Sequence, residues 1–197
     1  MADPLYLSLW YPSFEVEDML PRALSVMRQL PFSSQPSGIS GVALHPVSWN
    51  EATILEKRFK PGITPEAAVL IASDLLHEDY AYVFEAAWDL WIRDDQKREW
   101  TLQPSPVRFL AHGEEFENGV AQQEGHIQVD FGLDSPFLQE QVELTMESED
   151  RVRANVQKLV EFSAKAEKSS GARTRLLRSE SGENLAQKLI ARLQRVQ

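Results

Sequence analysis

The segment 80–92, which reads YAYVFEAAWDLWI, constrains the fold more than any other part of this chain. Read as a helix, its bulky side chains scatter around the axis, whereas a strand places every second residue on one face. Seven apolar residues then share a face: Tyr80, Tyr82, Phe84, Ala86, Trp88, Leu90 and Ile92. Aromatic side chains also suit a pleated surface. The segment therefore predicts a long strand whose aromatic face lies in the core.

Other segments have the composition or the alternation that is typical of strands. They are 5–12, 41–49, 51–59, 100–116 and 126–132. Pro104 and Pro106 each remove a hydrogen-bond donor from the segment 100–116, so we expect an edge or a bulge there. The polar segment that follows, 117–125, is expected to be a long hairpin loop.

Helical spacing of apolar residues predicts four helices. These are expected over 17–30, 64–76, 148–168 and 182–196. Pro21 falls in or beside the first turn of the first helix, or kinks it. Thr64 is an N-cap candidate, with Pro65 at the first helical position, and Ser148 is the N-cap candidate of the third helix.

The predicted elements follow one another as β-α-β-β-α-β, extended by two antiparallel strands and finished by C-terminal helices. The first six elements match the ferredoxin-like order, so the expected fold class is α+β. We expect an acidic α+β sheet domain over 1–146. A basic C-terminal helical segment over 147–197 is expected to pack on it.

The net charge of −10 conceals an asymmetry along the chain. Residues 151–197 hold 11 Lys and Arg against 4 Glu, whereas 1–150 hold 9 Lys and Arg against 26 Asp and Glu. The basic segment either docks on its own body or presents a solvated face. An acidic body favours a basic protein partner and disfavours nucleic acid, because phosphates require a basic footprint. The sequence also permits a homodimer.

The chain has no cysteine, which excludes disulfides and thiolate metal sites and fits a reducing compartment. No apolar run approaches the roughly 20 residues that span a bilayer. The first residues lack a basic stretch followed by an apolar stretch, so they do not resemble a secretory signal. We expect a soluble, cytoplasmic protein with no membrane association.

Familiar catalytic and cofactor motifs are missing from the sequence. The segment 37–41, SGISG, has neither the spacing nor the lysine of a phosphate-binding loop, and no Gly-x-Ser-x-Gly or His-Glu-x-x-His sequence occurs. The DFG at 130–132 stands without any other kinase element. We therefore predict no cofactor and assign no catalytic residue.

One predicted hairpin carries the best constellation of polar residues. By the period of two, His126 and Asp130 share the outward face of one strand, and His112 and Glu114 share a face of the strand before it. If these faces meet, two imidazoles and two carboxylates could bind a divalent metal or perform acid–base chemistry. The alternative is an ordinary solvated sheet face.

Trp91 lies on the outward face of the segment 80–92, together with Glu85 and Asp89. An outward tryptophan at this spacing either packs under a C-terminal helix or anchors a partner. These three residues are therefore candidates for partner binding.

Two classes of function remain open. The first is a non-enzymatic, acidic interaction module, such as an inhibitor, an immunity-type protein or an adaptor, that binds a basic protein. The second is a small-molecule-binding or metal-dependent hydrolytic protein that uses the polar hairpin face. The first is preferred, because the acidic body is evident whereas no catalytic motif is.

Overall fold

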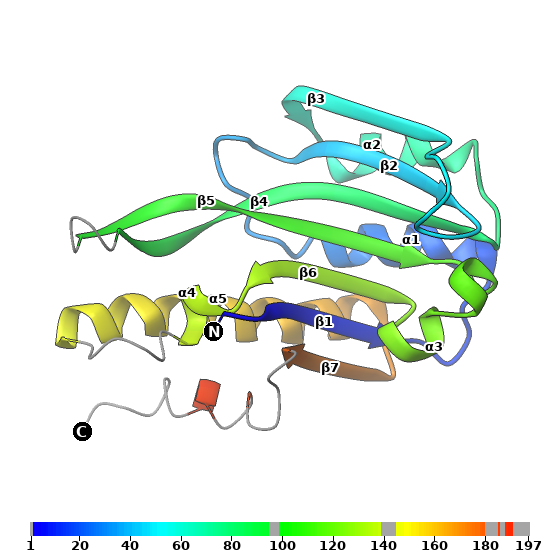
Figure 1. Cartoon of the computed structure of the whole chain (residues 1–197). Helices are drawn as coiled ribbons and strands as arrows, with labels where there is room; N and C mark the ends of the chain where they lie inside the picture. Colours follow the sequence, from blue (N-terminus) through cyan, green and yellow to red (C-terminus); the bar gives the residue numbers. More distant parts are fainter. Residues whose placement is uncertain (1, 95–98, 139–144, 180–184, 186–187, 191–197) are drawn as a thin grey trace.

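A computed structural model of the chain describes residues 2–94, 99–138, 145–179, 185 and 188–190. Its strands form one seven-stranded antiparallel sheet in the order β3-β2-β4-β5-β6-β1-β7 (Figure 1). The strands are β1 (Pro4–Trp10), β2 (Ile39–Pro46), β3 (Leu55–Ile63), β4 (Tyr80–Asp94), β5 (Glu99–His112), β6 (Ile127–Leu133) and β7 (Thr174–Ser179). The protein is therefore a mixed α+β structure built around an antiparallel sheet.

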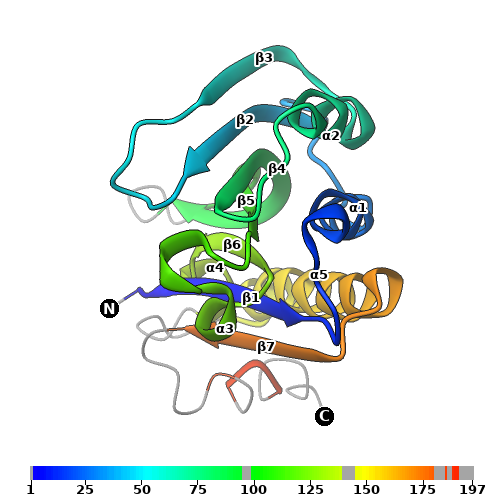
Figure 2. The same ribbon diagram turned by 90° about the vertical axis from the view of Figure 1, so that its right-hand side faces the viewer.

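Three long helices cover one face of this sheet, which we call the helix face. They are α1 (Val16–Met27), α2 (Pro65–Ser73) and α5 (Met146–Ser170), and Figure 2 shows them together on one side. The shorter helices are η1 (Phe116–Asn118), α3 (Ala121–Glu124) and α4 (Ser135–Leu138). The opposite face, which we call the open face, carries none of the three long helices. In the described ranges, no helix has both the length and the apolar character needed to cross a membrane.

The alternation predicted for the segment 80–92 is confirmed. Tyr82, Phe84 and Trp88 are all 0% exposed and belong to the main core on the helix face. The Trp88 ring stacks on Phe131 at 5.3 Å and meets Phe162 of α5 edge-on at 6.1 Å. The apolar face of β4 is thus buried against β6 and α5.

The ferredoxin-like arrangement is not confirmed, although the first six elements follow the predicted order along the chain. β1 lies between β6 and β7, separated from β2 by β4, β5 and β6. The reason is the long β4–β5 hairpin, which pairs from Ala81↔His112 to Asp94↔Glu99 and places β5 directly beside β4. β6 adds to β5, and β1 then pairs with β6. Strands that are consecutive along the chain thus lie side by side from β4 to β6, and β1 is added outside them, beside β6.

The prolines of β5 behave as predicted. Pro104 and Pro106 pair with Asp89 and Ala87 of β4, whereas β6 pairs with β5 only from Arg108 onward. This part of β5 is therefore a free edge, where a missing backbone donor costs no ladder hydrogen bond.

Several element boundaries differ from the sequence prediction. The strand expected over 51–59 begins only at Leu55, because 47–54 forms a loop after β2. The N-cap of α5 is Thr145 rather than Ser148, whose backbone N–H donates to the Thr145 hydroxyl at 3.3 Å. Thr64 caps α2 as predicted, with its hydroxyl accepting from Ala67 at 3.2 Å.

The C-terminal segment contributes a strand to the sheet in addition to helices. Residues 174–179 form the edge strand β7, which pairs with β1 along its length. Of the last predicted helix, residues 185 and 188–190 are helical, with Leu185 and Leu189 buried in the core. The remainder of that helix lies outside the described residues.

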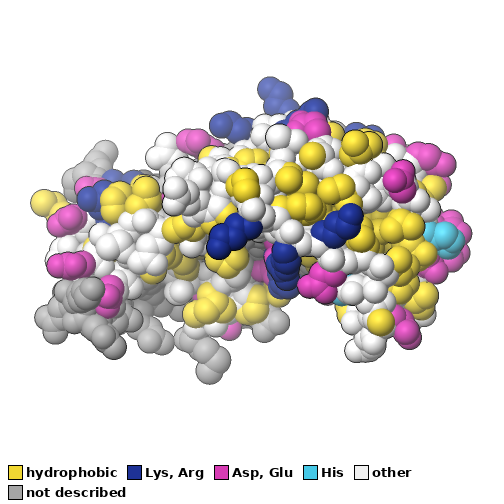
Figure 3. Space-filling model, turned by 90° about the horizontal axis from the view of Figure 1, so that it is seen from above, with side chains coloured by type: hydrophobic (Ala, Val, Ile, Leu, Met, Phe, Trp, Pro, Cys, Tyr) yellow, Lys and Arg dark blue, Asp and Glu magenta, His cyan; other side chains and the backbone are white. Residues whose placement is uncertain are grey.

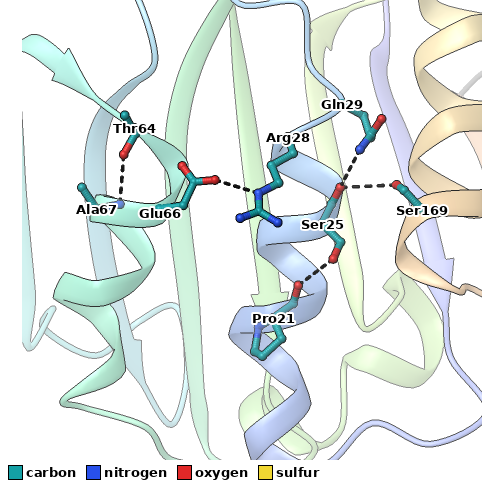
Figure 4. Close-up of polar contacts among 8 residues, drawn as sticks. All are labelled: Pro21, Ser25, Arg28, Gln29, Thr64, Glu66, Ala67 and Ser169. Atoms are coloured by element: carbon teal, nitrogen blue, oxygen red, sulfur yellow. Dashed lines mark hydrogen bonds and ion pairs between the residues drawn. The ribbon is translucent and has the colours of Figure 1, made fainter.

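Polar contacts join α1 to both neighbouring helices (Figure 4). The Arg28 guanidinium of α1 pairs with the Glu66 carboxylate of α2 at 2.7 Å and lowers the pKa of that carboxyl. On the other side, the Ser169 hydroxyl of α5 donates to the Ser25 carbonyl at 3.4 Å. These surface contacts fix the relative positions of helices whose main attachment is the core beneath them.

Asn155 ties α5 to the free edge of β4. It is 1% exposed, and its side-chain oxygen accepts from the Trp91 N–H at 2.9 Å. Its side-chain nitrogen donates to the Trp91 and Pro136 carbonyls at 2.8 and 2.9 Å. One amide thus replaces the neighbouring strand that β4 lacks at this point.

We expect Asn155→Ala to lower the free energy of unfolding by about 2–4 kcal/mol, because it leaves buried backbone groups of β4 without partners. Urea denaturation measures this difference. Gln157→Ala is the matched control, since this exposed side chain donates a hydrogen bond to Glu161 of its own helix and none is found to another element among the described residues. The control should stay within about 0.5 kcal/mol of the parent protein. Equal stability of the two variants would contradict the assigned role of Asn155.

Candidate functional site

Each strand of the sheet places one residue in a single row across the open face. From one edge to the other, the row is Arg58, Gly41, Glu85, Arg108, Asp130, Tyr6 and Arg178. We call this set the charged row. Its five charged members alternate in sign along the row, with the uncharged Gly41 and Tyr6 between them, an arrangement that favours cross-strand ion pairs.

Two ion pairs hold the charged row. The Arg58 guanidinium reaches over β2 to the Glu85 carboxylate, and a Cβ at Gly41 would lie 3.1 Å from atoms of both side chains. A glycine therefore leaves room for this contact between strands that are not neighbours. The Arg108 guanidinium pairs with Asp130, whose side chain is 8% exposed and also accepts from the Gly132 N–H at 2.8 Å.

The structure brings His112 and His126 side by side, with the His112 backbone N–H donating to the His126 carbonyl at 2.9 Å, but the four candidate side chains of the polar hairpin face lie in different surroundings. Asp130 belongs to the charged row, and Glu114 is exposed in the loop after β5. His112 is 0% exposed and stacks on Phe116, with ring centroids 6.3 Å apart. His126 stacks on the Phe14 ring at 4.6 Å. Among the residues that the structure describes, no three His, Asp or Glu side chains are grouped so that they could hold a metal ion.

One nitrogen of each of these two histidines is bonded to the backbone. His112 Nδ1 donates to the Gly125 carbonyl at 2.8 Å, whereas its Nε2 is buried without a hydrogen-bond partner among the described residues. His126 Nδ1 accepts from the Tyr11 N–H at 3.0 Å. These hydrogen bonds hold both rings against the backbone near the ends of strands.

The three candidate partner-binding residues are engaged within the chain. The Arg151 guanidinium of α5 lies 3.7 Å from the centre of the half-buried Trp91 ring. The Asp89 carbonyl accepts from Lys158 Nζ at 2.6 Å, and Glu85 pairs with Arg58. Of the two alternatives for Trp91, the structure places it against the C-terminal helix.

A surface that the sequence analysis did not identify lies at one end of the sheet. Three loops, 47–54, 74–79 and 113–119, contact one another there through backbone hydrogen bonds. They contain seven acidic residues and no Lys or Arg: Glu51, Asp74, Glu78, Asp79, Glu114, Glu115 and Glu117. We call this surface the acidic end. It lies at the right in Figure 1 and toward the viewer in Figure 2.

Figure 3 shows the distribution of charge as seen from the β3 edge. In this view, Lys and Arg side chains cross the middle, and Asp and Glu side chains lie beside a histidine at the right-hand end as well as at the left-hand end. The acidic end is therefore distinguished by the absence of Lys and Arg from its three loops. A local excess of one sign creates a local field that the total charge does not reveal.

Trp49 is at the centre of the acidic end. Its backbone N–H donates to the Glu117 carboxylate at 2.8 Å, and its ring meets Phe116 edge-on at 4.8 Å and His45 at 4.9 Å. The Glu117 N–H in turn donates to the Val47 carbonyl at 2.8 Å. The loops are therefore fixed to one another through both backbone and side chains.

Strained backbone conformations occur in the same loops. Val47, Glu117 and Asn118 have φ angles of 59°, 49° and 56°. Such values are uncommon outside glycine and exceptional for a β-branched residue such as valine. Strain of this kind persists where surrounding contacts over-determine the backbone, and it often accompanies a functional surface.

The sequence held a signal for the acidic end. The segments 74–79 and 113–119 are dense in acidic residues and lack any Lys or Arg, whereas most of the chain mixes both signs. Their proximity was not predictable, because it depends on which ends of β2, β4 and β5 lie together in the sheet.

Compared with models of known protein families, with curated proteins and with solved structures, the chain gives no match. The geometry of the molecule is therefore the basis for assigning a function.

Enclosure perturbs the histidines beside Trp49. Burial lowers the pKa of His112, with the Gly125 carbonyl opposing the change, and burial also lowers the pKa of His45. A protonated His112 would place a charged Nε2–H in an apolar site without an acceptor. The folded protein therefore favours the neutral imidazole.

We expect the free energy of unfolding to fall as the pH decreases below about 6.5, the ordinary histidine pKa. Above that pH the imidazole is neutral in both states, whereas below it the unfolded chain binds a proton that the folded chain resists. Denaturant unfolding between pH 8 and pH 5 measures the slope, which should be shallower in His112→Gln. His45→Gln, whose ring is less enclosed, should change the slope less. An unchanged slope in His112→Gln would refute this role of His112.

Proposed function

We propose that this protein is a non-enzymatic interaction module that binds a basic protein partner through the acidic end. Inhibitors, immunity-type proteins and adaptors act in this way. The observation that carries the proposal is the gathering of seven acidic residues, without any Lys or Arg, on three interlocked loops around Trp49. Segregated charge of one sign supports capture of a partner of the opposite sign.

The rigidity of the loops favours binding. Backbone hydrogen bonds of 2.8 Å from Val47 to Asp79 and 3.0 Å from Glu115 to Glu78 join the three loops before any partner arrives. A surface that is already ordered loses little conformational entropy on association. Trp49 adds an aromatic side chain at the centre of the charged surface, which is typical of residues that dominate binding energy.

The state of the candidate catalytic groups also supports a non-enzymatic role. Of the candidate acid–base residues, Asp130 is paired with Arg108, and His112 is enclosed by aromatic rings. A general acid or base must reach a substrate proton, and these groups are occupied or covered. We further infer that the partner is not a nucleic acid, because the acidic end would repel phosphates, and that the protein acts in a reducing cytoplasm.

We expect the affinity for a basic partner to depend on the acidic end and on salt. The experiment immobilises the protein, identifies captured proteins by mass spectrometry, and then measures Kd for each purified candidate. Replacing Glu78, Glu114 and Glu115 together by glutamine should raise the Kd of a true partner by about tenfold or more. Raising the salt concentration from about 0.05 M to about 0.5 M should also weaken the binding of this partner steeply, because exposed charges are screened.

The matched control neutralises Glu99, Glu147 and Glu161, which are exposed acidic residues outside the acidic end. It changes the net charge by the same amount, so a loss confined to the first variant assigns binding to the acidic end. Equal losses of affinity in both variants would mean that binding depends on the total charge of the protein and not on the acidic end. A partner that is acidic, or whose affinity does not depend on salt, would overturn the proposed function.

A further inference from the structure

A cavity of about 420 Å³ opens on the part of the sheet farthest from β3. It is lined by Tyr6, Glu124, Gln128, Arg178 and Ser179, which come from β1, α3, β6 and β7. Figure 1 shows these elements side by side at the lower part of the sheet. Its volume lies within the range of small-molecule sites.

Polar groups without partners gather around this cavity. Arg178 Nε is buried without an acceptor, and the Arg178 guanidinium lies 5.8 Å from the centre of the Tyr6 ring. Gln128 is 4% exposed, and its side-chain amide has no hydrogen-bond partner among the described residues. Ser8, opposite Gln128 on β1, is 0% exposed, with an unpartnered hydroxyl.

Such groups are costly unless something binds them. A buried donor without an acceptor costs about 1–3 kcal/mol, and more when it is charged. In a chain of net charge −10, Arg178 lacks an ion pair with any described carboxylate, although acidic residues outnumber basic ones. Its guanidinium fork and the Gln128 amide are donors of the kind that bind an oxyanion.

Glu124 further restricts the kind of ligand that the cavity can bind. It places a carboxylate on the wall formed by α3, while Arg178 places a cation on the wall formed by β7. A dianion such as phosphate would be repelled by Glu124, whereas a ligand with charges of both signs satisfies both walls. The Tyr6 ring provides an aromatic surface that a cationic group can approach.

We propose that this cavity binds a small carboxylate that also carries a protonated amine, as α-amino acids do. The carboxylate binds Arg178 and Gln128, and the ammonium group faces Glu124. This site is separate from the acidic end and does not depend on the identity of the protein partner.

NMR titration of the ¹⁵N-labelled full chain tests the proposal with L-alanine, acetate, methylammonium and inorganic phosphate at constant ionic strength. L-alanine should cause saturable shifts of the Gln128 side-chain amide and the Arg178 Nε–H in the millimolar range. Acetate and phosphate should bind more weakly. Equal affinity for acetate and L-alanine would overturn the role of Glu124, and the absence of saturable shifts with L-alanine would overturn the proposal.

Variants locate the site. Arg178→Gln should weaken L-alanine binding by about tenfold or more, because it removes charge-assisted hydrogen bonds. Arg173→Gln is the matched control. Arg173 is exposed and directly precedes β7, and its replacement removes the same charge as Arg178→Gln does. Equal weakening in the two variants would overturn the assignment.

Two other residues that line the cavity, Gln128 and Glu124, allow independent tests. If the spectrum of Arg178→Gln shows loss of fold, Gln128→Met replaces it and should also weaken binding. Glu124→Gln should reduce the affinity for L-alanine to that for acetate. Unchanged binding in both Gln128→Met and Glu124→Gln would overturn the proposal.

Discussion

Trp88, Phe84 and Tyr82 project from β4 into the space between the sheet and its helices, where all three are 0% exposed. Burying a side chain of this size stabilises the fold by roughly 1.5–3 kcal/mol relative to leaving it in water. The Trp88 ring contacts β6, α4 and α5 through Phe131, Phe137 and Phe162. The placement of the C-terminal helix thus depends on the aromatic face of one strand.

The same constraint determines what the opposite face can do. Because α1, α2 and α5 cover the aromatic face, the alternate residues of the central strands face away from these helices, where charged side chains keep access to water. Glu85 and Arg108 occupy directly opposed positions there and connect to Arg58 and Asp130. The charged row is therefore a consequence of strand alternation combined with a register fixed by the β4–β5 hairpin.

Local features of the chain were predictable, whereas features that join distant segments were not. The alternation in 80–92, the cap at Thr64 and the edge at Pro104 each depend on a few neighbouring residues, and each is confirmed. The position of β1 depends on its pairing with β6 and β7, both distant along the chain, so it could not be read from the sequence of β1 itself. His112 illustrates the limit for the candidate site: the face that it shares with Glu114 followed from the period of two. Its complete burial depends on the nearby Phe116 and on Trp49, which lies in a loop far away along the chain.

The way in which the basic C-terminal segment docks explains why the acidic end keeps its charge. Arg151 stacks on the Trp91 ring, Lys158 donates to the Asp89 carbonyl, and Arg178 lies over the Tyr6 ring. These contacts place basic side chains against aromatic faces and a backbone oxygen, so they neutralise no carboxylate of the body. The ion pairs of Arg151 and Arg175 are made with Glu147 and Glu167, both on α5 itself. None of these contacts of the described segment lies at the acidic end, whose carboxylates lie on three loops at one end of the molecule, where the proposed basic partner would bind.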